Sequence, residues 1–252
     1  MQLHRFYLPP PHAREDVLHL DGREAHHASR VLRLKPGDGA VVLDGAGNEF
    51  VCAVEDMGRE SLSLAVQKKN TIPAPPCSIT LYVAVPKGKI IESIIQKAVE
   101  LGARAIAPLL TERVVTRLDA KSAEQKREQW EQVAIEAMKQ CGTAWLPEIK
   151  TPAPVEHFLA QKKCELQLVG SLQKERRHPR EVFQEYDKAN GRLPRSAAAW
   201  IGPEGDFTPE ELQAIQSGGA QAISLGRLVL RVETAATYCL SILNYELNSR
   251  DT

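Results

Sequence analysis

A proline-rich segment near residue 70 divides the chain into two parts with different sequence patterns. Residues 70–76 read Asn-Thr-Ile-Pro-Ala-Pro-Pro. Proline fixes its backbone φ and lacks an N–H donor, so this segment cannot continue a helix or a central strand and favours an extended spacer. At 252 residues the chain is long enough for one domain or two. The spacer predicts a first domain over residues 1–72 and a second over residues 73–252.

The part before the spacer consists of short runs that are typical of β-strands. Runs typical of strands occupy 40–43 and 49–54, the second apolar after Glu49, and residues 61–66 alternate strictly between apolar and polar, as in a half-buried strand. The acidic, glycine-containing stretch 44–47 lies between two of these runs with no helix behind it, so we expect a hairpin turn there rather than a cofactor loop. The sequence predicts a small, mainly β domain.

The part after the spacer alternates between strand and helix patterns. Buried strands are expected at 79–85, 104–110, 166–170, 197–201 and 220–225. Helices are expected at 89–101, at about 120–141, from Thr208-Pro209 onward and at 233–248. This alternation predicts an α/β domain with a mostly parallel sheet covered by helices.

Composition excludes several classes of protein. Hydrophobic residues make up 43% of the chain, and 32 Lys and Arg balance 32 Asp and Glu, which argues against disorder and against a globally basic nucleic-acid binder. No apolar stretch approaches the roughly 18–20 residues that span a bilayer, so no membrane association is expected. The first residues lead into prolines rather than an apolar export signal, so we expect a cytoplasmic protein.

The cysteines and histidines give no metal-ligand pattern. The five cysteines are far apart in the sequence without a C-x-x-C pair, and the seven histidines form no H-x-x-x-H pair. We therefore expect no metal site and no disulfide framework, but reduced and mostly buried thiols.

Three glycine-containing junctions follow expected strands and begin at Gly170, at Gly202-Pro203-Glu204-Gly205 and at Gly226. Ligands of open α/β sheets bind beyond the carboxyl ends of the strands, where glycine lets backbone groups approach a ligand. Each junction alone is most often an ordinary turn, but three together favour a shared binding site. None matches G-x-x-x-x-G-K-[ST] or G-x-G-x-x-G, so neither an ATP-hydrolysing phosphate loop nor the usual dinucleotide fingerprint is present.

Two groups of basic residues are candidates for nucleic-acid contacts. The first, at 23–35, contains Arg23, Arg30, Arg33 and Lys35, which suit phosphate binding; the alternative is a solvated helix face that pairs with Glu24 and Asp38. The second group, in which Glu175 and Glu181 favour an ordinary solvated face, contains Lys174, Arg176, Arg177, His178 and Arg180.

Several motifs occur in an order that resembles a known family. They are Leu-His-Arg-Phe-Tyr at 3–7, His-His-Ala-Ser-Arg-Val-Leu-Arg at 26–33, Lys-Gly at 87–88, Lys-Ala-Val-Glu-Leu-Gly at 97–102, Lys-Gln-Cys at 139–141, Ile-Gly-Pro-Glu-Gly at 201–205 and Leu-Gly at 225–226 with Leu-Arg-Val-Glu-Thr-Ala at 230–235. Together they resemble the bacterial small-subunit ribosomal RNA uridine-N3 methyltransferases of the SPOUT superfamily. The match extends from residue 3 to about residue 240.

The resemblance implies a PUA-like RNA-binding domain followed by an α/β domain with a deep trefoil knot at its carboxyl-terminal end. It also implies a homodimer, S-adenosylmethionine (SAM) as methyl donor, and N3 of one uridine of 16S ribosomal RNA as acceptor, in free RNA or in the assembled small subunit. Two departures from the family pattern stand out: Asp206 replaces a common glycine, and Thr143-Ala144-Trp145 replaces a segment that often carries Arg or Lys.

The resemblance and the chemistry of methyl transfer together give a set of candidate site residues. Arg231 is the candidate cation for charge that develops on the uracil carbonyl oxygens, and Glu204 or Glu233 could receive the proton from N3. The expected cofactor-binding residues are Leu168, Gly170, Ile201, Gly202, Pro203, Glu204, Gly205, Leu225, Gly226, Leu228 and Leu230. The expected RNA-binding residues are Arg5, His26, Arg30, Arg33, Lys35, Lys87, Lys139 and Gln140.

Some alternatives stay open at the level of sequence. A catalytically silent RNA-binding assembly factor would keep the same α/β domain as a docking surface, whereas a nucleotide-dependent oxidoreductase is disfavoured by the missing fingerprint. The helix expected at 233–248 is apolar over much of its circumference, which fits either a dimer interface or full burial within one chain.

Overall fold

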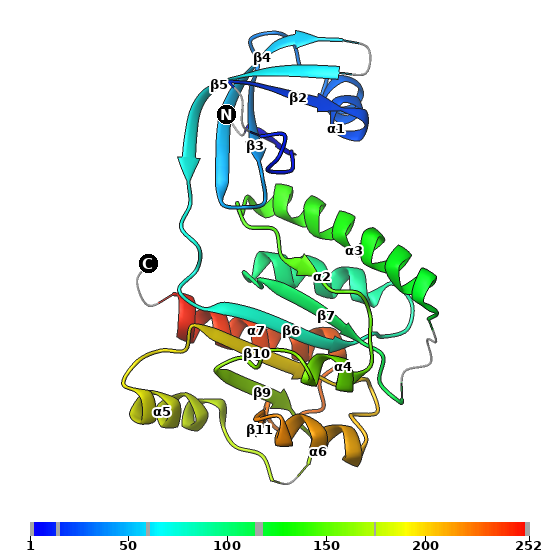
Figure 1. Ribbon diagram of the computed structural model, residues 1–252, viewed down its shortest axis with the longest axis vertical. Helices are drawn as coiled ribbons and strands as arrows, with labels where there is room; N and C mark the ends of the chain where they lie inside the picture. The colour runs from blue at the N-terminus through cyan, green and yellow to red at the C-terminus, as the bar shows by residue number, and fades with distance from the viewer. Residues whose placement is uncertain (1–2, 14–15, 59–60, 114–117, 174, 250–252) are drawn as a thin grey trace. The chain divides into compact units, whose positions relative to one another are not determined.

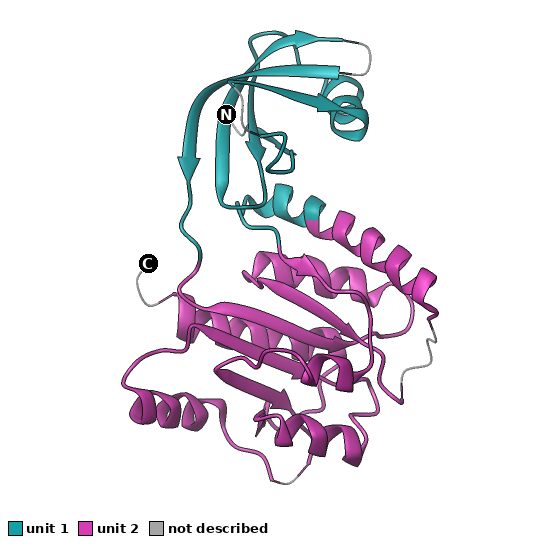
Figure 2. Ribbon diagram, in the orientation of Figure 1, with its two compact units in different colours: residues 1–74, 135–146 teal, residues 75–134, 147–252 magenta. Residues whose placement is uncertain are grey.

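The structure is a computed structural model that describes residues 3–13, 16–58, 61–113, 118–173 and 175–249. The chain forms two units, coloured separately in Figure 2: unit 1 contains residues 1–74 and 135–146, and unit 2 contains residues 75–134 and 147–252. The sequence pattern gave no sign that residues 135–146 pack with the first part of the chain. Local sequence patterns could not reveal this association, because it depends on tertiary contacts between this segment and the turn of a hairpin in unit 1.

Unit 1 is built on a five-stranded sheet with the strand order β1-β3-β4-β5-β2 (Figure 1). Its strands are β1 (His4–Tyr7), β2 (Val17–Asp21), β3 (Gly39–Leu43), β4 (Asn48–Met57) and β5 (Ser61–Thr71). β1 pairs with β3 in parallel, and the other neighbours are antiparallel. The prediction of a mainly β first part is confirmed, and β5 continues beyond the expected 61–66.

The turn between β3 and β4 confirms the expected hairpin. The buried Asp44 carboxylate accepts hydrogen bonds from the backbone N–H of Ala46 at 2.8 Å and of Asn48 at 2.9 Å. These bonds satisfy donors that the turn would otherwise leave unpaired, as is usual for an Asp at the start of a turn. The stretch 44–47 therefore belongs to a hairpin and is not a cofactor loop.

A short helical segment covers one face of this sheet. It consists of α1 (Gly22–His26) and the π-helical turn η1 (His27–Val31). Ala25 and Ala28 point inward and join the core cluster of Phe6, Leu18 and Leu20. Small residues on the inner face let the helical backbone approach the sheet closely, so the longer polar side chains are left on the outer face.

Unit 2 contains a six-stranded, wholly parallel sheet with the order β11-β9-β10-β6-β7-β8. Its strands are β6 (Ser78–Ala84), β7 (Ala105–Leu109), β8 (Glu148–Ile149), β9 (Leu166–Gly170), β10 (Ser196–Ile201) and β11 (Gln221–Ile223). The predicted parallel α/β sheet is confirmed. β11 is shorter than the expected 220–225, and β8 was not predicted because two residues carry no periodic signal.

Helices lie on the sheet of unit 2 as a parallel sheet requires. They are α2 (Ile90–Glu100), α3 (Ala120–Cys141), α4 (Val155–Leu159), α5 (Pro179–Asn190), α6 (Pro209–Ser217) and α7 (Val232–Asn248), with the last turns of α3 belonging to unit 1. α7 packs on α2 and on strands β6 and β10 (Figure 1). The helices expected around 89–101, 120–141, 208 onward and 233–248 are confirmed. α4 and the largely polar α5 were missed.

The start of α6 follows the local sequence signal directly. The Thr208 hydroxyl accepts the backbone N–H of Glu211 at 3.2 Å, and the Glu211 carboxylate accepts the backbone N–H of Thr208 at 3.0 Å. This capping box fixes the point at which the chain turns from the preceding loop into the helix. The loop after β10 is therefore anchored at its far end.

Glu165 joins three segments near the amino ends of β9 and β10. Its carboxylate accepts hydrogen bonds from the Arg192 guanidinium at 2.9 Å, the Tyr186 hydroxyl at 2.9 Å and the Arg195 backbone N–H at 3.0 Å. These contacts, that with Arg192 first, lower the pKa of Glu165 from 4.5 to about 2. The carboxylate thus ties the end of α5 to the sheet.

This lowered pKa predicts an acid-dependent loss of stability. The stabilisation by ionised Glu165 is complete above pH 4.5 and disappears as the pH falls toward 2, because the folded protein then takes up the proton. Glu165→Gln should lower the Tm at pH 7 by no more than about 4 °C, and the difference from wild type should shrink steadily below pH 4.5.

Thermal unfolding followed by circular dichroism between pH 7 and pH 2.5 measures this difference. Glu128→Gln, at an exposed glutamate on α3, controls for the loss of a negative charge in general. A constant Tm difference across the whole pH range would contradict the assignment.

Candidate functional site

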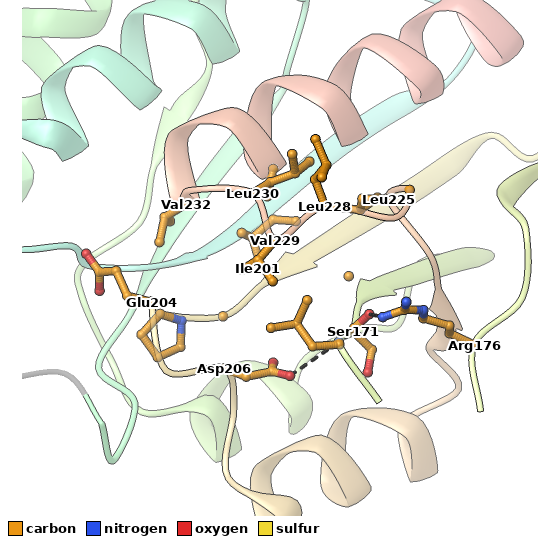
Figure 3. Close-up of a pocket in the computed structure, with 16 residues that line it drawn as sticks. Ser171, Arg176, Ile201, Glu204, Asp206, Leu225, Leu228, Val229, Leu230 and Val232 are labelled. Atoms are coloured by element: carbon orange, nitrogen blue, oxygen red, sulfur yellow. Dashed lines mark hydrogen bonds between the residues drawn. The ribbon is translucent and has the colours of Figure 1, made fainter. Parts of the chain in front are cut away.

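The three glycine junctions of unit 2 meet around one pocket. They follow β9, β10 and β11, and together they enclose about 560 Å³ that is open to solvent (Figure 3). The lining residues are Gly170, Ser171, Leu172, Arg176, Ile201, Gly202, Pro203, Glu204, Asp206, Leu225, Gly226, Leu228, Val229, Leu230, Val232 and Ala235. The expected convergence of the junctions is confirmed.

Strand pairing explains why the junctions meet. Val169 of β9 pairs with Trp200 of β10, and Gly170 pairs with Ile223 of β11. All three strands are parallel, so their carboxyl ends lie at one edge of the sheet at nearly the same height. The loops that leave this edge are therefore neighbours even though the chain separates them by about thirty and twenty residues.

Two of the glycines lie where a side chain would be crowded or strained. A Cβ atom on Gly170 would lie 3.3 Å from Leu225 Cδ1 and 3.5 Å from Ile201 Cδ1, which are side chains of the other two junctions. Gly226 has a φ of +112°, which residues with side chains rarely adopt. At both positions the backbone forms part of the wall of the pocket, and the N–H and C=O groups of Gly226 bond to the Ser224 hydroxyl.

Asp206 occupies the position at which the family often has glycine, and its backbone explains the preference. Its φ is +64°, in the left-handed region that Asp tolerates better than most residues. Its carboxylate accepts the backbone N–H of Phe207 at 2.8 Å and that of Leu172, on the neighbouring loop, at 3.4 Å. The side chain thus joins the first and second junctions and retains the glycine-like turn.

Arg113 supports the same loop from outside and was missed by sequence reasoning. Its guanidinium donates to the carbonyl of Gly205 and lies 3.4 Å from the carbonyl oxygens of Asp206 and Phe207. Next to it, the backbone N–H of Glu112 donates to the Glu211 carboxylate at 2.9 Å. Arg113 follows β7, so the rule that ligands bind beyond the strand carboxyl ends could have pointed to it.

The pocket has an apolar side that faces solvent. Leu228 and Val229 are 78% and 73% exposed although both line the pocket. Burying such side chains against a ligand would remove apolar surface from water, which favours binding. Leu168 and Gly205 were also expected at the cofactor site; Leu168 is buried in β9, and neither residue lines the pocket.

The three catalytic candidates differ in their placement. Glu204 lines the pocket, with its side chain exposed (Figure 3). Arg231 is exposed and forms the N-cap position of α7, between the lining residues Leu230 and Val232. Glu233 lies in the first turn of α7 and lines a different hollow, together with Thr237 and Tyr238 on the outer face of that helix. Their catalytic roles stay predictions.

The second basic group separates into residues with different surroundings. Arg176 lines the pocket, whereas Arg177 forms ion pairs with Glu181 and Glu185 of α5. His178 is the N-cap of α5 and accepts the backbone N–H of Arg180. Lys174 lies outside the described residues. The expectation of an ordinary solvated face describes Arg177, but it does not describe Arg176, which lines the pocket.

In the first basic group, Arg23 pairs with Glu136 of α3 at 3.5 Å. The exposed Arg30, Arg33 and Lys35, together with the nearby exposed His26, are called the arginine cluster below. The alternative expectation, that these cations pair with Glu24 and Asp38, is not what the structure shows. The Glu24 carboxylate pairs with Lys139 at 2.7 Å, and the Asp38 carboxylate accepts the backbone N–H of Lys35. Within the described residues, the arginine cluster has no acidic partner for its side chains.

Arg5 and Lys139 contact other parts of unit 1 instead of facing solvent freely. The Arg5 guanidinium donates to the carbonyl oxygens of Lys139 and Gln140 at the end of α3, where a cation is favourable to the helix dipole. Lys139 is 7% exposed and pairs with Glu24 and Glu136. Gln140 is exposed on unit 1, and Lys87 is exposed on the loop after β6 in unit 2. The RNA contacts of Arg5, Lys87, Lys139 and Gln140 stay predictions.

The departure at 143–145 has a structural role in unit 1. The backbone N–H of Gly47 donates to the Ala144 carbonyl at 2.9 Å, and the Trp145 indole N–H donates to the Pro73 carbonyl at 3.1 Å. A Cβ atom on Gly47 would lie 2.5 Å from the Trp145 ring. Trp145 therefore fixes the β3–β4 hairpin turn against the segment that follows α3.

The cysteines and the acidic residues show no second chemical site. Burial raises the pKa of the Cys52 thiol to about 11 and that of Cys77 to about 12, which disfavours the reactive thiolate. The expectation of mostly buried thiols does not hold for Cys141, which is exposed, or for Cys164, which is half-buried. In the described ranges, no group of three or more His, Cys, Asp or Glu residues could hold a metal ion, and no helix has the length and apolarity to cross a membrane.

Two family models match the two parts of the chain. The model described as RNA methyltransferase domain matches residues 73–244, and the one described as RNA methyltransferase PUA domain matches residues 20–67. Among curated proteins, the ribosomal RNA small subunit methyltransferase E of Synechocystis is 34% identical over 98% of this chain and 78% of its own length. That of Bacillus subtilis is 29% identical over 90% of this chain and 89% of its own.

Solved structures give the same result. A Legionella pneumophila protein described as a methyltransferase with bound SAM has a TM-score of 0.86 at 30% identity, and covers 98% of each chain. The Neisseria gonorrhoeae ribosomal RNA small subunit methyltransferase E, bound to S-adenosyl methionine, has a TM-score of 0.83 at 25% identity and covers 97% of this chain and 98% of its own. From the matched domains, the curated relatives and the fold, this chain belongs to the ribosomal RNA small subunit methyltransferase E family.

Proposed function

We propose that the pocket binds SAM and that the protein transfers its methyl group to N3 of one uridine in small-subunit ribosomal RNA. The convergence of three glycine junctions on one pocket, within the matched RNA methyltransferase domain, is the observation that carries the proposal. The two solved relatives described with bound SAM support the choice of cofactor. The choice of uridine N3 rests on the sequence resemblance alone.

The lining of the pocket fits the parts of SAM. Backbone groups of the three junctions at Gly170, Gly202 and Gly226 would meet the adenine and ribose edges, because glycine has no side chain of its own to hold a ligand away. Ile201, Leu225, Leu228, Val229 and Leu230 would cover the apolar surfaces. Pro203 stiffens the second loop, and Leu168 and Gly205 would act indirectly by shaping it. The cofactor supplies one chemical function, a methyl group made electrophilic by its sulfonium.

The residues near the pocket would serve the acceptor. As the bond from N3 to the methyl carbon forms and the carbon–sulfur bond breaks, the N3 proton must leave, and negative charge spreads onto the flanking carbonyl oxygens. Arg231, which is exposed beside the lining residue Leu230, would stabilise that charge. Glu204, which lines the pocket whereas Glu233 lines a different hollow, would receive the proton, directly or through a water. Alignment of the acceptor would contribute most to the rate.

Unit 1 would hold the RNA through its phosphates. His26, Arg30, Arg33 and Lys35 are exposed, and their charges are not used by neighbouring acids. Arginine and lysine position a nucleic acid by its backbone without reading its sequence. Because the chain has no net charge, binding to RNA depends on such local clusters.

The proposal includes a homodimer that works in the cytoplasm, where ribosomal RNA of bacteria is modified. One face of α7 is buried within the chain, but Tyr238 and Tyr245 are 46% and 71% exposed on its outer face. A second copy packed on this face would cover both rings, in an arrangement typical of symmetric dimers. The trefoil knot is also part of the proposal, supported by the resemblance and by the position of β10 between β9 and β6.

The main test is mass mapping of modified uridines. Unmodified small-subunit RNA, free or assembled, is incubated with SAM and enzyme, digested and analysed by mass spectrometry. We expect one N3-methyluridine in one of the two substrates, and Arg231→Ala should reduce kcat about a hundredfold or more with little change in the Kd of SAM.

Equal losses in kcat and in SAM affinity would assign Arg231 to binding instead. The absence of both methylation and saturable SAM binding would leave the silent assembly factor as the function of the chain.

Arg113 should matter for cofactor binding without contacting the cofactor. Arg113→Ala removes the donor that orients three loop carbonyls, so the Kd of SAM should rise roughly threefold to tenfold, with an intermediate effect for Arg113→Lys. Isothermal titration calorimetry measures the change. Arg127→Ala, which removes an arginine paired with Glu124 and Glu131 on α3, is the matched control and should leave the Kd unchanged.

The arginine cluster should set the salt dependence of RNA binding. Removing one phosphate contact reduces the slope of log Kobs against log salt by about 0.7–0.9, so Arg30→Ala with Arg33→Ala should reduce it by up to about two units. Filter binding at several salt concentrations measures the slope. The control variant Lys68→Ala with Lys69→Ala removes the same amount of charge from exposed positions on β5, and it should change the slope less. Equal effects of the two pairs would show that only total charge matters.

A further inference from the structure

We propose that Arg176 binds the α-carboxylate of the amino-acid part of SAM and thereby makes the pocket specific for nucleosides that carry an amino acid. The inference rests on the proposed assignment of the pocket to SAM. It concerns a residue that the sequence reasoning placed on an ordinary solvated face.

Arg176 is the only cation among the lining residues that the structure describes. It is half-buried, and its Nη1 donates to the Ser171 carbonyl at 3.3 Å, so the side chain is held at the edge of the first junction (Figure 3). A guanidinium has five N–H donors, and the contact with Ser171 uses one of them. The remaining donors can form the paired hydrogen bonds with which arginine binds carboxylates.

Backbone pairing explains why Arg176 turns to the pocket while its neighbour turns away. Arg177 forms a parallel bridge with Ile223 of β11: its N–H donates to the Ala222 carbonyl, and its carbonyl accepts the N–H of Ser224, both at 2.9 Å. Successive side chains of such an extended segment point to opposite sides. Arg177 accordingly reaches Glu181 and Glu185 on α5, and Arg176 lies on the other side, at the pocket.

The acids of the pocket complement this arrangement. Glu204 and Asp206 also line it, and Asp206 accepts the N–H of the Ser171–Leu172 peptide group, whose carbonyl binds Arg176. The amino-acid end of SAM carries a carboxylate and an ammonium group, which match one cation and neighbouring carboxylates. The sulfonium adds a second positive charge that the acids also favour. A nucleoside without the amino-acid end would make neither contact.

The same geometry disfavours an RNA phosphate as the partner of Arg176. A phosphate brought to Arg176 would also approach the carboxylate of Asp206, which bonds to the N–H of the same peptide group whose carbonyl binds Arg176, and this carboxylate would repel it. In the described part of the chain, the side chains of the arginine cluster on unit 1 form no ion pair and are better suited to a phosphate. The observations therefore favour the cofactor carboxylate.

Calorimetry with ligands of graded length tests the proposal. Wild type, Arg176→Ala and Arg176→Lys are titrated with S-adenosylhomocysteine and with 5′-methylthioadenosine, which lacks the amino-acid end. Arg176→Ala should weaken S-adenosylhomocysteine about tenfold to a hundredfold and leave 5′-methylthioadenosine within about twofold of wild type. Arg176→Lys should fall between. Arg177→Ala, the neighbouring arginine outside the pocket, should bind both ligands as wild type does.

Each result shows whether the role of Arg176 or the assignment of the pocket to SAM is wrong. Equal weakening of both ligands would make Arg176 a support of the loop, and weakening of RNA alone would make it a phosphate contact; either result overturns the proposal. Wild type that binds neither ligand would overturn the assignment of the pocket itself. Should Arg176→Ala fail to fold, the methyl ester of S-adenosylhomocysteine on wild type removes the same charge from the ligand, and unchanged affinity for the ester would also overturn the proposal.

Discussion

The parallel pairing of β9 with both β10 and β11 is the constraint on which the pocket depends. Because Val169 pairs with Trp200 and Gly170 with Ile223, the three strands end at one edge of the sheet. A shift of one residue in either register would move Gly170 out of line and turn its neighbours to the opposite face. Because consecutive residues of β9 and β10 are buried on both faces, that shift would require both layers of the core to repack. The core therefore fixes the position of the loops before any contact within the loops forms.

Polar contacts from outside the pocket then hold the loop after β10. Asp206 adopts a positive φ, which costs a residue with a side chain on the order of 1–2 kcal/mol. Its carboxylate offsets this cost by accepting the N–H groups of Phe207 and Leu172. On the other side, Arg113 donates to the loop carbonyls. Glycine would adopt this turn without strain but would not fix it. Asp206 gives a strained turn that hydrogen bonds hold from two sides. The wall of the pocket is then formed before the ligand binds, which favours binding.

The elements with clear periodicity could be predicted from sequence, and those set by tertiary contacts could not. Strands β6, β9 and β10 and helices α2 and α7 are strongly patterned because burial dictates their residues. Glycine at the strand ends then indicated where a pocket would form. Sequence could not show that Lys139 is buried in an ion pair, since its partner Glu24 lies 115 positions away. Arg113 and Arg176 both follow strands of the parallel sheet, which could have directed attention to them, but the sequence does not show which loop carbonyl or pocket each guanidinium reaches.

The Lys139–Glu24 pair also bears on how a chain without net charge can attract RNA. Glu24 lies in the same short helical segment as Arg30, and as a free carboxylate it would weaken the positive potential there. Lys139 reaches it at 2.7 Å with only 7% of its side chain exposed, so the two charges cancel where solvent screens them little. Such a buried pair need not add to stability. Its effect is to remove an acid from the neighbourhood of the arginine cluster, so that a local positive surface survives on a protein whose charges sum to zero.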